Sequence, residues 1–353
     1  MSESSPVSPR VSVALGSRNG AAYIAEQVAS ILAQRPAPVE IVLGDDASDD
    51  GTIAIVEQTL AAARAADPDL VTELVVRRHE TPRGVRENFA DAMSACRGEL
   101  IALSDQDDVW AVDKLARLVP LFADPALQLV HTDARLIDDV GTPLGLTLLD
   151  ALEATRRERE GLAHGDAFLV LLRRNLVTGA TVVFRRSLLR DAAPFPDGWV
   201  HDEWLAALAS GLSAEPGALR LIEEPLIDYR QHASNQIGAR KPSLGDKLAR
   251  LSEPRDERAP RLAHRAWQLE RRLELRGAPP DRVIQAESKH MHEETRAALP
   301  RMRLLRIPSV LRGWAAGRYE RYSRGSIDVL RDLPPPGATR SRSTSMEPRL
   351  YLS

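Results

Sequence analysis

The feature that most constrains this chain is a regular alternation of apolar β-type segments and helical segments over its first 123 residues. Four segments rich in aliphatic and β-branched residues predict strands: residues 11–15, 39–44, 72–78 and 99–104. Four segments between and after them predict helices: residues 20–34, 52–66, 84–96 and 112–123. Strands that alternate with helices predict the α/β class, with a parallel sheet covered by helices.

Three of the predicted strands end in polar motifs: GSRNG at 16–20, DDASDDGT at 45–52 and SDQDD at 104–108. The carboxyl ends of parallel strands share one edge, where such sheets bind ligands. Two carboxylates about 4 Å apart repel by roughly 4 kcal/mol at an effective dielectric near 20. A divalent cation offsets this repulsion, and such ions take one or two carboxylates together with phosphate oxygens and water. A solvated acidic turn is the alternative for each motif.

Charge and cysteine content limit the partners and the compartment. The formal net charge of -3 creates no global field that would attract nucleic acid. The single cysteine, Cys96, excludes an intrachain disulfide and suits a reducing compartment. Residues 1–10 lack the apolar core of a secretory signal, and no apolar run is long enough to span a bilayer. We therefore expect a cytoplasmic protein that reaches a membrane only from its surface.

The later part of the chain changes character. Residues 147–160 form a charged connector, and residues 218–232 predict two short strands. From about residue 241 the sequence is Arg-rich and helical, and residues 333–353 lack periodicity and predict a disordered tail. The arginines form either solvated, salt-bridged helix faces or a basic surface that contacts anionic lipid headgroups.

Several segments together resemble the inverting family 2 glycosyltransferases, whose fold is GT-A. They are VSVALGSRNGAAYIAEQ, VEIVLGDDASDDGT and RGVRENFADAMSACRGELIALSDQDDVW, followed by NLVTGATVVFRRSLL, HDEWLAALA and PLIDYRQHASNQIGA. The later segments resemble a rhamnosyltransferase-like branch. The resemblance implies a GT-A domain with a mostly parallel sheet over 8–240, followed by a helical extension over 241–332 and the tail.

The resemblance also implies an activity. It implies transfer of a hexose or deoxyhexose, with rhamnose as the first candidate, from a nucleoside diphosphate. The acceptor would be a saccharide or lipid-linked glycan of a bacterial surface polysaccharide. The cofactor would be Mn²⁺ or Mg²⁺, and the contact with the inner face of the plasma membrane would be peripheral.

Site residues follow from the resemblance, position by position. Asp105 would meet the ribose or the metal, Asp107 would ligate the metal, and Asp202 in HDEW would be the general base. The remaining nucleotide contacts would be Ser17, Arg18, Asn19, Asp45, Asp46 and Arg86. The donor or acceptor sugar would meet Asn175, Thr178, Gly179, Trp199, His201 and Glu203. His232 would complete the metal site.

Some of these positions keep an alternative. Asp202 could be a helix N-cap, Trp199 could pack on the domain, and His232 could be a loop histidine. Arg18 stands where the family has a tyrosine near the base, which leaves the base preference open. His201 replaces the usual glutamate of the base motif.

Two alternatives to glycosyl transfer are a sugar nucleotidyltransferase and a catalytically inactive scaffold. A sugar nucleotidyltransferase would carry a Gly-rich, basic phosphate loop after the first strand, followed by a lysine, and GSRNGAAYIAEQ has neither. A catalytically inactive scaffold would have no need to keep Asp45, Asp105, Asp107 and Asp202 together. Loss of nucleotide binding with EDTA would favour the enzyme.

Overall fold

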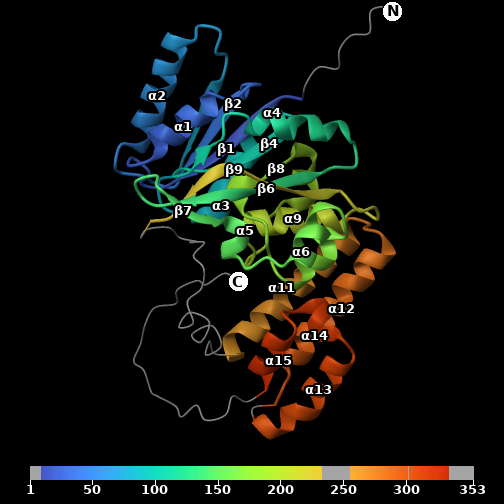
Figure 1. Ribbon diagram of the computed structural model, residues 1–353. Helices are drawn as coiled ribbons and strands as arrows, with labels where there is room; N and C mark the ends of the chain where they lie inside the picture. The colour runs from blue at the N-terminus through green and yellow to red at the C-terminus, as the bar shows by residue number, and fades with distance from the viewer. Residues whose placement is uncertain (1–8, 233–254, 301, 334–353) are drawn as a thin grey trace, which may run out of the picture. The chain divides into compact units, whose positions relative to one another are not determined.

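The protein is seen in a computed structural model that describes residues 9–232, 255–300 and 302–333. Its first part is a nine-stranded sheet flanked by helices, which confirms the predicted α/β class (Figure 1). The strands are β1 (Val11–Ser17), β2 (Glu40–Asp45), β3 (Glu73–Arg78), β4 (Leu100–Asp105), β5 (Val109–Trp110), β6 (Leu129–Ile137), β7 (Pro143–Thr147), β8 (Val183–Arg185) and β9 (Leu219–Arg230). Their order is β3-β2-β1-β4-β8-β6-β9-β5, with β7 paired to β6.

The N-terminal half of the sheet is parallel, as the alternation predicted. β3, β2, β1 and β4 pair in parallel, and their register brings their carboxyl ends level. Ser17 lies opposite Asp45, Gly16 lies opposite Asp105, and Asp45 lies opposite Arg78. The polar motifs that follow β1, β2 and β4 therefore meet at one edge of the sheet.

The second half of the sheet is mixed. β8 pairs antiparallel with β4 and β6, and β5 pairs antiparallel with β9, whereas β6 and β9 are parallel. Residues 219–230 form one long strand where we expected two short ones. The register against β6 shifts between Ile222 and Pro225, because proline has no N–H for the ladder and Glu223 and Glu224 are left over.

The alternating side chains of the strands build a core on both faces of the sheet. Val11, Val13 and Leu15 of β1 point to the face that α1 (Ile24–Leu32) and α2 (Thr52–Ala66) cover, and they pack in one buried cluster with apolar residues of both helices. Gly16 points to the other face, where α3 (Val85–Ala95) brings Phe89 against it. The carboxyl edge is thus set on a rigid, two-sided core.

The other helices differ from the predictions mainly in length. The predicted helix 112–123 is an α-helix, α4 (Lys114–Leu118), continued by a 3₁₀ turn over Val119–Ala123 that has a proline in its first turn. The connector 147–160 contains two short helices, each with a capping box at its start. The helices of this region are α5 (Leu148–Ala151), α6 (Arg156–Ala163), α7 (Ala167–Arg173), α8 (Leu189–Ala192) and α9 (His201–Gly211).

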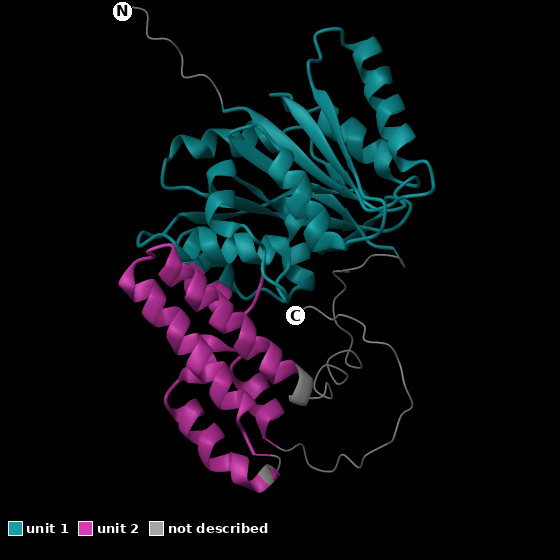
Figure 2. Cartoon of the chain, turned by 180° about the vertical axis from the view of Figure 1, so that it is seen from behind, with its two compact units in different colours: residues 1–167, 176–241 teal, residues 168–175, 242–353 magenta. Residues whose placement is uncertain are grey.

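The chain divides into two compact units (Figure 2). Unit 1 contains residues 1–167 and 176–241, and unit 2 contains residues 168–175 and 242–353. The described helices of unit 2 after residue 254 are α11 (Arg255–Leu275), α12 (Pro280–Ala297), α13 (Ile307–Ala315), α14 (Arg318–Tyr322) and α15 (Ser326–Asp332). The predicted boundary near residue 240 and the predicted disordered tail lie outside the described residues, apart from Leu333. Within the described ranges, no helix is both long and apolar enough to cross a bilayer.

Candidate active site

The loop after β1 is held by the loop after β2. The hydroxyl groups of Ser48 and Thr52 accept hydrogen bonds from the backbone N–H groups of Asn19 and Gly20, both at 2.9 Å. Asp50 accepts a third bond at 2.9 Å, from the N–H of Ala21. The acidic DDASDDGT motif thus serves in part as a scaffold that fixes the backbone of the GSRNG loop.

Gln106, the middle residue of the Asp105–Asp107 triplet, holds the same loop from the other side. Its side-chain oxygen accepts from the N–H of Arg18 at 2.8 Å, and its amide nitrogen donates to the carbonyl of Arg18 at 3.1 Å. Gly20 permits this approach, because a Cβ atom there would lie 2.4 Å from that oxygen. The sequence did not predict a role for Gln106, which lies between the predicted site residues Asp105 and Asp107.

Asp45 and Asp46 have different surroundings although they are adjacent. The Asp45 carboxylate is fully buried and accepts from the hydroxyl of Ser17 at 3.2 Å and the N–H of Ser48 at 3.0 Å. Asp46 accepts from the N–H groups of Arg83 and Gly84 at 2.6 and 3.0 Å. Each oxygen of Asp46 is therefore already bonded to the loop before α3, and its predicted nucleotide contact stays a prediction.

Three carboxylates gather where β4 ends: Asp105, Asp107 and Asp108. Burial raises the pKa of Asp105 to about 8, and the neighbouring charges of Asp107 and Asp202 add to this. Burial also raises the pKa of Asp108 well above its usual value, and Asp107 adds to that. The charge of Asp202 acts on Asp105, so the two carboxylates lie near each other in the fold, and the role of Asp202 as the base stays a prediction.

A buried lysine accompanies this acidic cluster. Lys114 of α4 is fully buried, donates to the carbonyl of Ala180 at 3.0 Å and lies 3.8 Å above the centre of the Trp110 ring. Burial lowers the pKa of Lys114 to about 7, although the charges of Asp108 and Asp105 oppose this. Lys114 is thus the basic group of the acidic cluster, and it is about half protonated at pH 7. No pattern in the sequence indicated a buried lysine here, because lysines on a predicted helix are normally exposed.

Asp107 already has a partner. Its Oδ2 atom lies 2.8 Å from Nε2 of His232, and both side chains are largely buried. Tyr23 stacks on His232 with ring centres 5.0 Å apart, and the guanidinium of Arg230 lies 4.9 Å from the Tyr23 ring. Arg230 also donates to the carbonyl of Asp107 at 2.8 Å, which fixes the backbone of the triplet.

Asp202 lies in the first turn of α9 and is 8% exposed. Burial raises its pKa to about 6, although the backbone N–H groups of Glu203 and Gly179 donate to it and oppose the shift. Gly179 lies so close that a Cβ atom there would be 3.4 Å from Oδ2 of Asp202 and 3.2 Å from Nε2 of His201. The predicted residues Gly179, His201 and Asp202 thus form one group.

His201 is buried against α3. Its ring stacks on Phe89 with centres 4.1 Å apart, and burial lowers its pKa to about 3, so the imidazole is neutral. Within the part of the chain that the structure describes, neither of its ring nitrogens has a hydrogen-bond partner. An unsatisfied buried donor or acceptor costs about 1–3 kcal/mol, which a ligand hydroxyl group would recover.

The remaining predicted residues lie in varied surroundings. Arg86 donates to Asp197 at 2.6 Å and pairs with Glu87, so its charge is engaged within unit 1. The Trp199 ring meets Trp204 edge-on, with centres 5.1 Å apart. Thr178 directly precedes the short 3₁₀ turn at Gly179. Asn175 is the last residue of the short segment assigned to unit 2.

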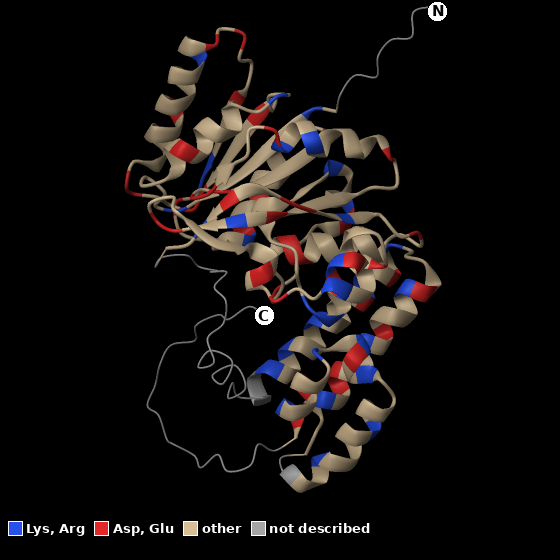
Figure 3. Ribbon diagram, viewed as in Figure 1, with Lys and Arg blue, Asp and Glu red and all other residues tan. Residues whose placement is uncertain are grey.

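The residues present fit a divalent cation whose coordination is completed by the phosphate oxygens of a bound substrate and by water. Among the described residues, no three His, Cys, Asp or Glu side chains form a ready cage. Asp107 and His232 nevertheless place a carboxylate oxygen and an imidazole nitrogen 2.8 Å apart at the acidic edge. Divalent ions that act on phosphates take one or two protein ligands and fill the other positions with phosphate oxygens and water. Figure 3 shows acidic residues, coloured red, in the loops at the ends of the strands.

Comparison with known proteins agrees with this geometry. The sequence profile described as Glycosyl transferase family 2 matches residues 12–191, which include β1 to β4 and the acidic triplet. The chain belongs to glycosyl transferase family 2. The match covers the half of the site that binds the nucleotide in the resemblance described above, and it ends before Asp202 and His232.

Several curated relatives are similar to this chain. The protein named uncharacterized glycosyltransferase alr2836, from Nostoc, is 26% identical over 64% of this chain and 66% of its own length. TuaG of Bacillus subtilis, named for teichuronic acid biosynthesis, is 30% identical over 66% of this chain and 83% of its own. The dTDP-rhamnosyl transferase RfbG of Shigella flexneri is 23% identical over 63% and 72%. The chain spans 57% to 66% of the length of several such relatives, alr2836 among them.

Two solved structures share the fold. S. aureus TarS, in a complex with UDP-GlcNAc, superposes with a TM-score of 0.56 at 14% identity, over 91% of this chain and 89% of that one. The mannosyltransferase PcManGT from Pyrobaculum calidifontis, in a complex with GDP-Man and Mn²⁺, gives a TM-score of 0.50 at 21% identity, over 93% and 85%. The predicted GT-A fold is therefore confirmed for this family 2 chain.

Proposed function

We propose that this chain transfers a sugar from a nucleoside-diphosphate donor to a saccharide or lipid-linked glycan acceptor, in one inverting displacement that needs a divalent cation. The observation that carries the proposal is the proximity of Asp202 to Asp105, whose pKa the charge of Asp202 helps to raise. It joins a buried carboxylate of raised pKa to the edge where Asp107 and His232 lie. A general base close to a metal-binding carboxylate suits the attack of a hydroxyl group on a sugar that bears a charged leaving group.

The chain's own residues would divide the work as follows. Asp45 and Ser17 hold the level ends of β2 and β1 for the base and ribose, and Gln106 keeps the Arg18 backbone in place. Asp107 and His232 would hold Mn²⁺ or Mg²⁺, with Asp105 near the ribose. When bound, the cation neutralises the negative charge that develops on the leaving diphosphate.

Asp202 would take the proton from the acceptor hydroxyl group. The oxygen then attacks the anomeric carbon from the face opposite the diphosphate, the bond to the diphosphate breaks, and the configuration inverts. A pKa of about 6 keeps Asp202 mostly ionised at neutral pH and makes it a stronger base than an exposed aspartate. His201 and Gly179 lie against Asp202, and a hydroxyl group of either sugar could satisfy the unpartnered nitrogens of His201.

The finer identity of the substrates rests on the relatives. TuaG is named for teichuronic acid biosynthesis and RfbG for dTDP-rhamnosyl transfer, which supports a surface polysaccharide product and rhamnose as the first donor to test. Arg18 stands where the family has a tyrosine near the base, so the base preference is open. UDP, GDP and dTDP donors therefore all need to be tested. A cytoplasmic location belongs to the same proposal.

The test is a donor panel on the full chain. UDP-, GDP- and dTDP-sugars are incubated with Mn²⁺, with Mg²⁺ or with EDTA, and donor binding and nucleoside-diphosphate release are both measured. We expect metal-dependent binding and release with one donor class. Asp202→Asn should keep binding and lose release, whereas the exposed control Asp113→Asn should behave as wild type. Absence of binding for every donor, or normal turnover by Asp202→Asn, would refute the proposal.

A further inference from the structure

The inference concerns the surface of unit 2 formed by Met302–Arg318, here called the α13 surface. From Thr295 to Tyr319 the sequence has six arginines and no Asp, Glu or Lys, with Glu294 and Glu320 on either side. By contrast, α11 and α12 each contain four acidic residues as well as basic ones. The α13 surface therefore carries a local excess of positive charge, although the net charge of the whole chain is -3.

Large apolar side chains are exposed along the same segment. Leu304 is 75% exposed, Leu305 59% and Trp314 52%, and Met302 and Leu311 are also exposed. Leu311 and Trp314 are three residues apart on α13, so they lie on one face of the helix. In the described part of unit 1, the exposed large apolar residues are spread over a much longer stretch: Val71, Val76, Val112, Val140 and Leu144.

The positive charge near this segment is not equally available. Arg296 of α12 is buried and paired with Glu293 at 3.0 Å, Asp328 at 3.5 Å and Asp332 at 2.7 Å, so its charge is neutralised within the unit. Arg312 of α13 and Arg318 of α14 are both exposed. Among the described residues, no hydrogen bond or ion pair engages either of their guanidinium groups.

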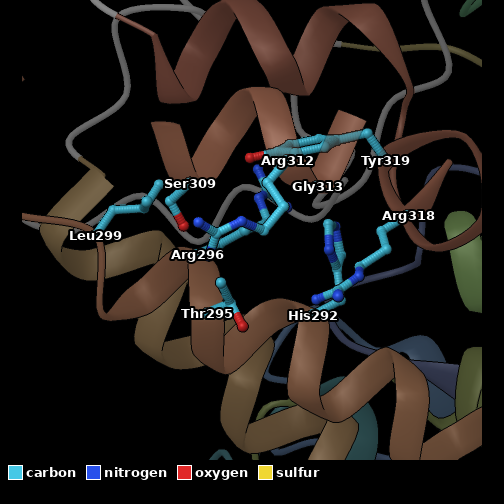
Figure 4. Close-up of a pocket in the computed structure, with 9 residues that line it drawn as sticks. All are labelled: His292, Thr295, Arg296, Leu299, Ser309, Arg312, Gly313, Arg318 and Tyr319. Atoms are coloured by element: carbon cyan, nitrogen blue, oxygen red, sulfur yellow. The ribbon is translucent and has the colours of Figure 1, made fainter. Parts of the chain in front are cut away.

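Arg312 and Arg318 also line a common cavity of about 230 Å³ in unit 2, shown in Figure 4. Ser309 of α13 and Thr295 of α12 line it as well, together with Tyr319 of α14. Two unpaired guanidinium groups beside hydroxyl groups suit phosphate oxygens. The cavity therefore offers a place for a phosphate group next to the exposed apolar side chains.

We propose that the α13 surface binds an anionic phospholipid bilayer. Leu304, Leu305, Leu311 and Trp314 would enter the headgroup region, and Arg312 and Arg318 would contact lipid phosphates. A basic segment with interleaved leucine and tryptophan has the composition of helices that lie in the membrane interface. Neutral lipid would satisfy only the apolar part, so binding should depend on lipid charge.

Vesicle binding of the full chain tests this proposal independently of glycosyl transfer. We expect co-sedimentation with phosphatidylglycerol vesicles and much less with phosphatidylcholine vesicles. Each arginine near an anionic surface changes the partition coefficient about fivefold, so Arg312→Gln with Arg318→Gln should lower it about 25-fold. The matched control is Arg35→Gln with Arg156→Gln, two exposed arginines of unit 1. Equal losses in both double variants, or no binding by wild type, would overturn the proposal.

A fluorescence measurement identifies the inserted residue without relying on loss of binding. Brominated phosphatidylglycerol should quench the tryptophan emission of wild type and of the control Trp267→Phe, since Trp267 is 44% exposed on α11. It should quench Trp314→Phe clearly less. Equal quenching in all three proteins would overturn the insertion of Trp314. A concentration-dependent dimer that Trp314→Ala dissociates, with no vesicle binding, would assign the surface to a second copy of the chain. Donor binding should persist in every variant, which separates this proposal from the proposed function.

Discussion

Nε2 of His232 lies 2.8 Å from Oδ2 of Asp107, although 125 residues separate them in the sequence. Asp107 follows the central strand β4, and His232 follows β9, the neighbour of β6 in the second half of the sheet. The stack of Tyr23 on His232 and the bond from Arg230 to the carbonyl of Asp107 hold this pair in place. An imidazole nitrogen and a carboxylate oxygen thus lie together at the acidic edge.

The first prediction concerns metal preference. Imidazole suits Mn²⁺ better than Mg²⁺, so His232→Ala should weaken Mn²⁺-dependent nucleotide binding by about tenfold or more and change Mg²⁺-dependent binding little. Calorimetric titration of each metal in the presence of a nucleoside diphosphate measures this. His164→Ala, which removes an exposed histidine, is the control. An equal loss for both metals would show that His232 acts only by positioning Asp107.

The second prediction concerns pH. The pKa of Asp202 is about 6 because the group is buried, and only its ionised form can accept a proton. The value of kcat/KM should therefore be constant above about pH 7 and fall tenfold per pH unit well below pH 6. A rate profile that is flat down to pH 5 would contradict the assignment of Asp202 as the base.

The raised pKa of Asp202 also has a consequence for stability. An aspartate whose pKa is higher in the folded state than in the unfolded state lowers the stability of the fold as pH rises above its unfolded value near 3.9. Asp202→Asn should therefore raise the free energy of unfolding by up to about 3 kcal/mol at pH 7.5. That gain should vanish at about pH 3 and below, where Asp202 is protonated in both the folded and the unfolded state of the wild type. Urea unfolding at the two pH values measures it.

The third prediction concerns Lys114, the buried basic group of the acidic cluster. Its charge faces Asp105 and Asp108, so Lys114→Met should destabilise the fold at pH 7. Lys114→Met should cost less when Asp108→Asn has already removed one carboxylate. The coupling energy of this double-mutant cycle should lie between about 0.5 and 3 kcal/mol, measured by urea unfolding without metal. Strict additivity would show that the two groups do not interact.

The fourth prediction concerns Gln106. Its two hydrogen bonds to the Arg18 backbone contribute about 1 kcal/mol each, and they order the loop that would meet the nucleotide. Gln106→Ala should raise the donor KM roughly tenfold and leave kcat within about twofold. The control is Gln128→Ala, which removes an amide that donates to the carbonyls of Pro125 and Ala126. A fall in kcat at constant KM would place Gln106 in the chemical step instead.

The sequence predicted the parts of the fold that depend on local pattern and chain order. Parallel strands must bring Ser17, Asp45 and Asp105 to one edge, and the register does so. The mixed second half was not predicted, because β8 and β5 pair antiparallel, and an alternation of strands and helices predicts only parallel pairing. Lys114 and Phe89 were missed because only the folded chain brings them beside Asp105 and His201.

Structure also separates residues that looked equivalent in the sequence. Asp45 and Asp46 are adjacent acids, yet both oxygens of Asp46 bind the backbone before α3. The guanidinium group of Arg86 pairs with Asp197 and Glu87, and its contact with the nucleotide stays a prediction. Neither arrangement could be read from the motif alone, because each partner comes from a distant loop or from the neighbouring position on the same helix.

The central claim is that the acidic edge anchors a sugar-bearing diphosphate through a cation held by Asp107 and His232. The most direct measurement is anomalous diffraction from crystals grown with Mn²⁺ and a nucleoside diphosphate. We predict a Mn²⁺ peak in contact with the Asp107 carboxylate and Nε2 of His232, bridging to the diphosphate and facing Asp202. A bound nucleotide with Mn²⁺ elsewhere, or a diphosphate that lies away from Asp107 and Asp202, would contradict the claim.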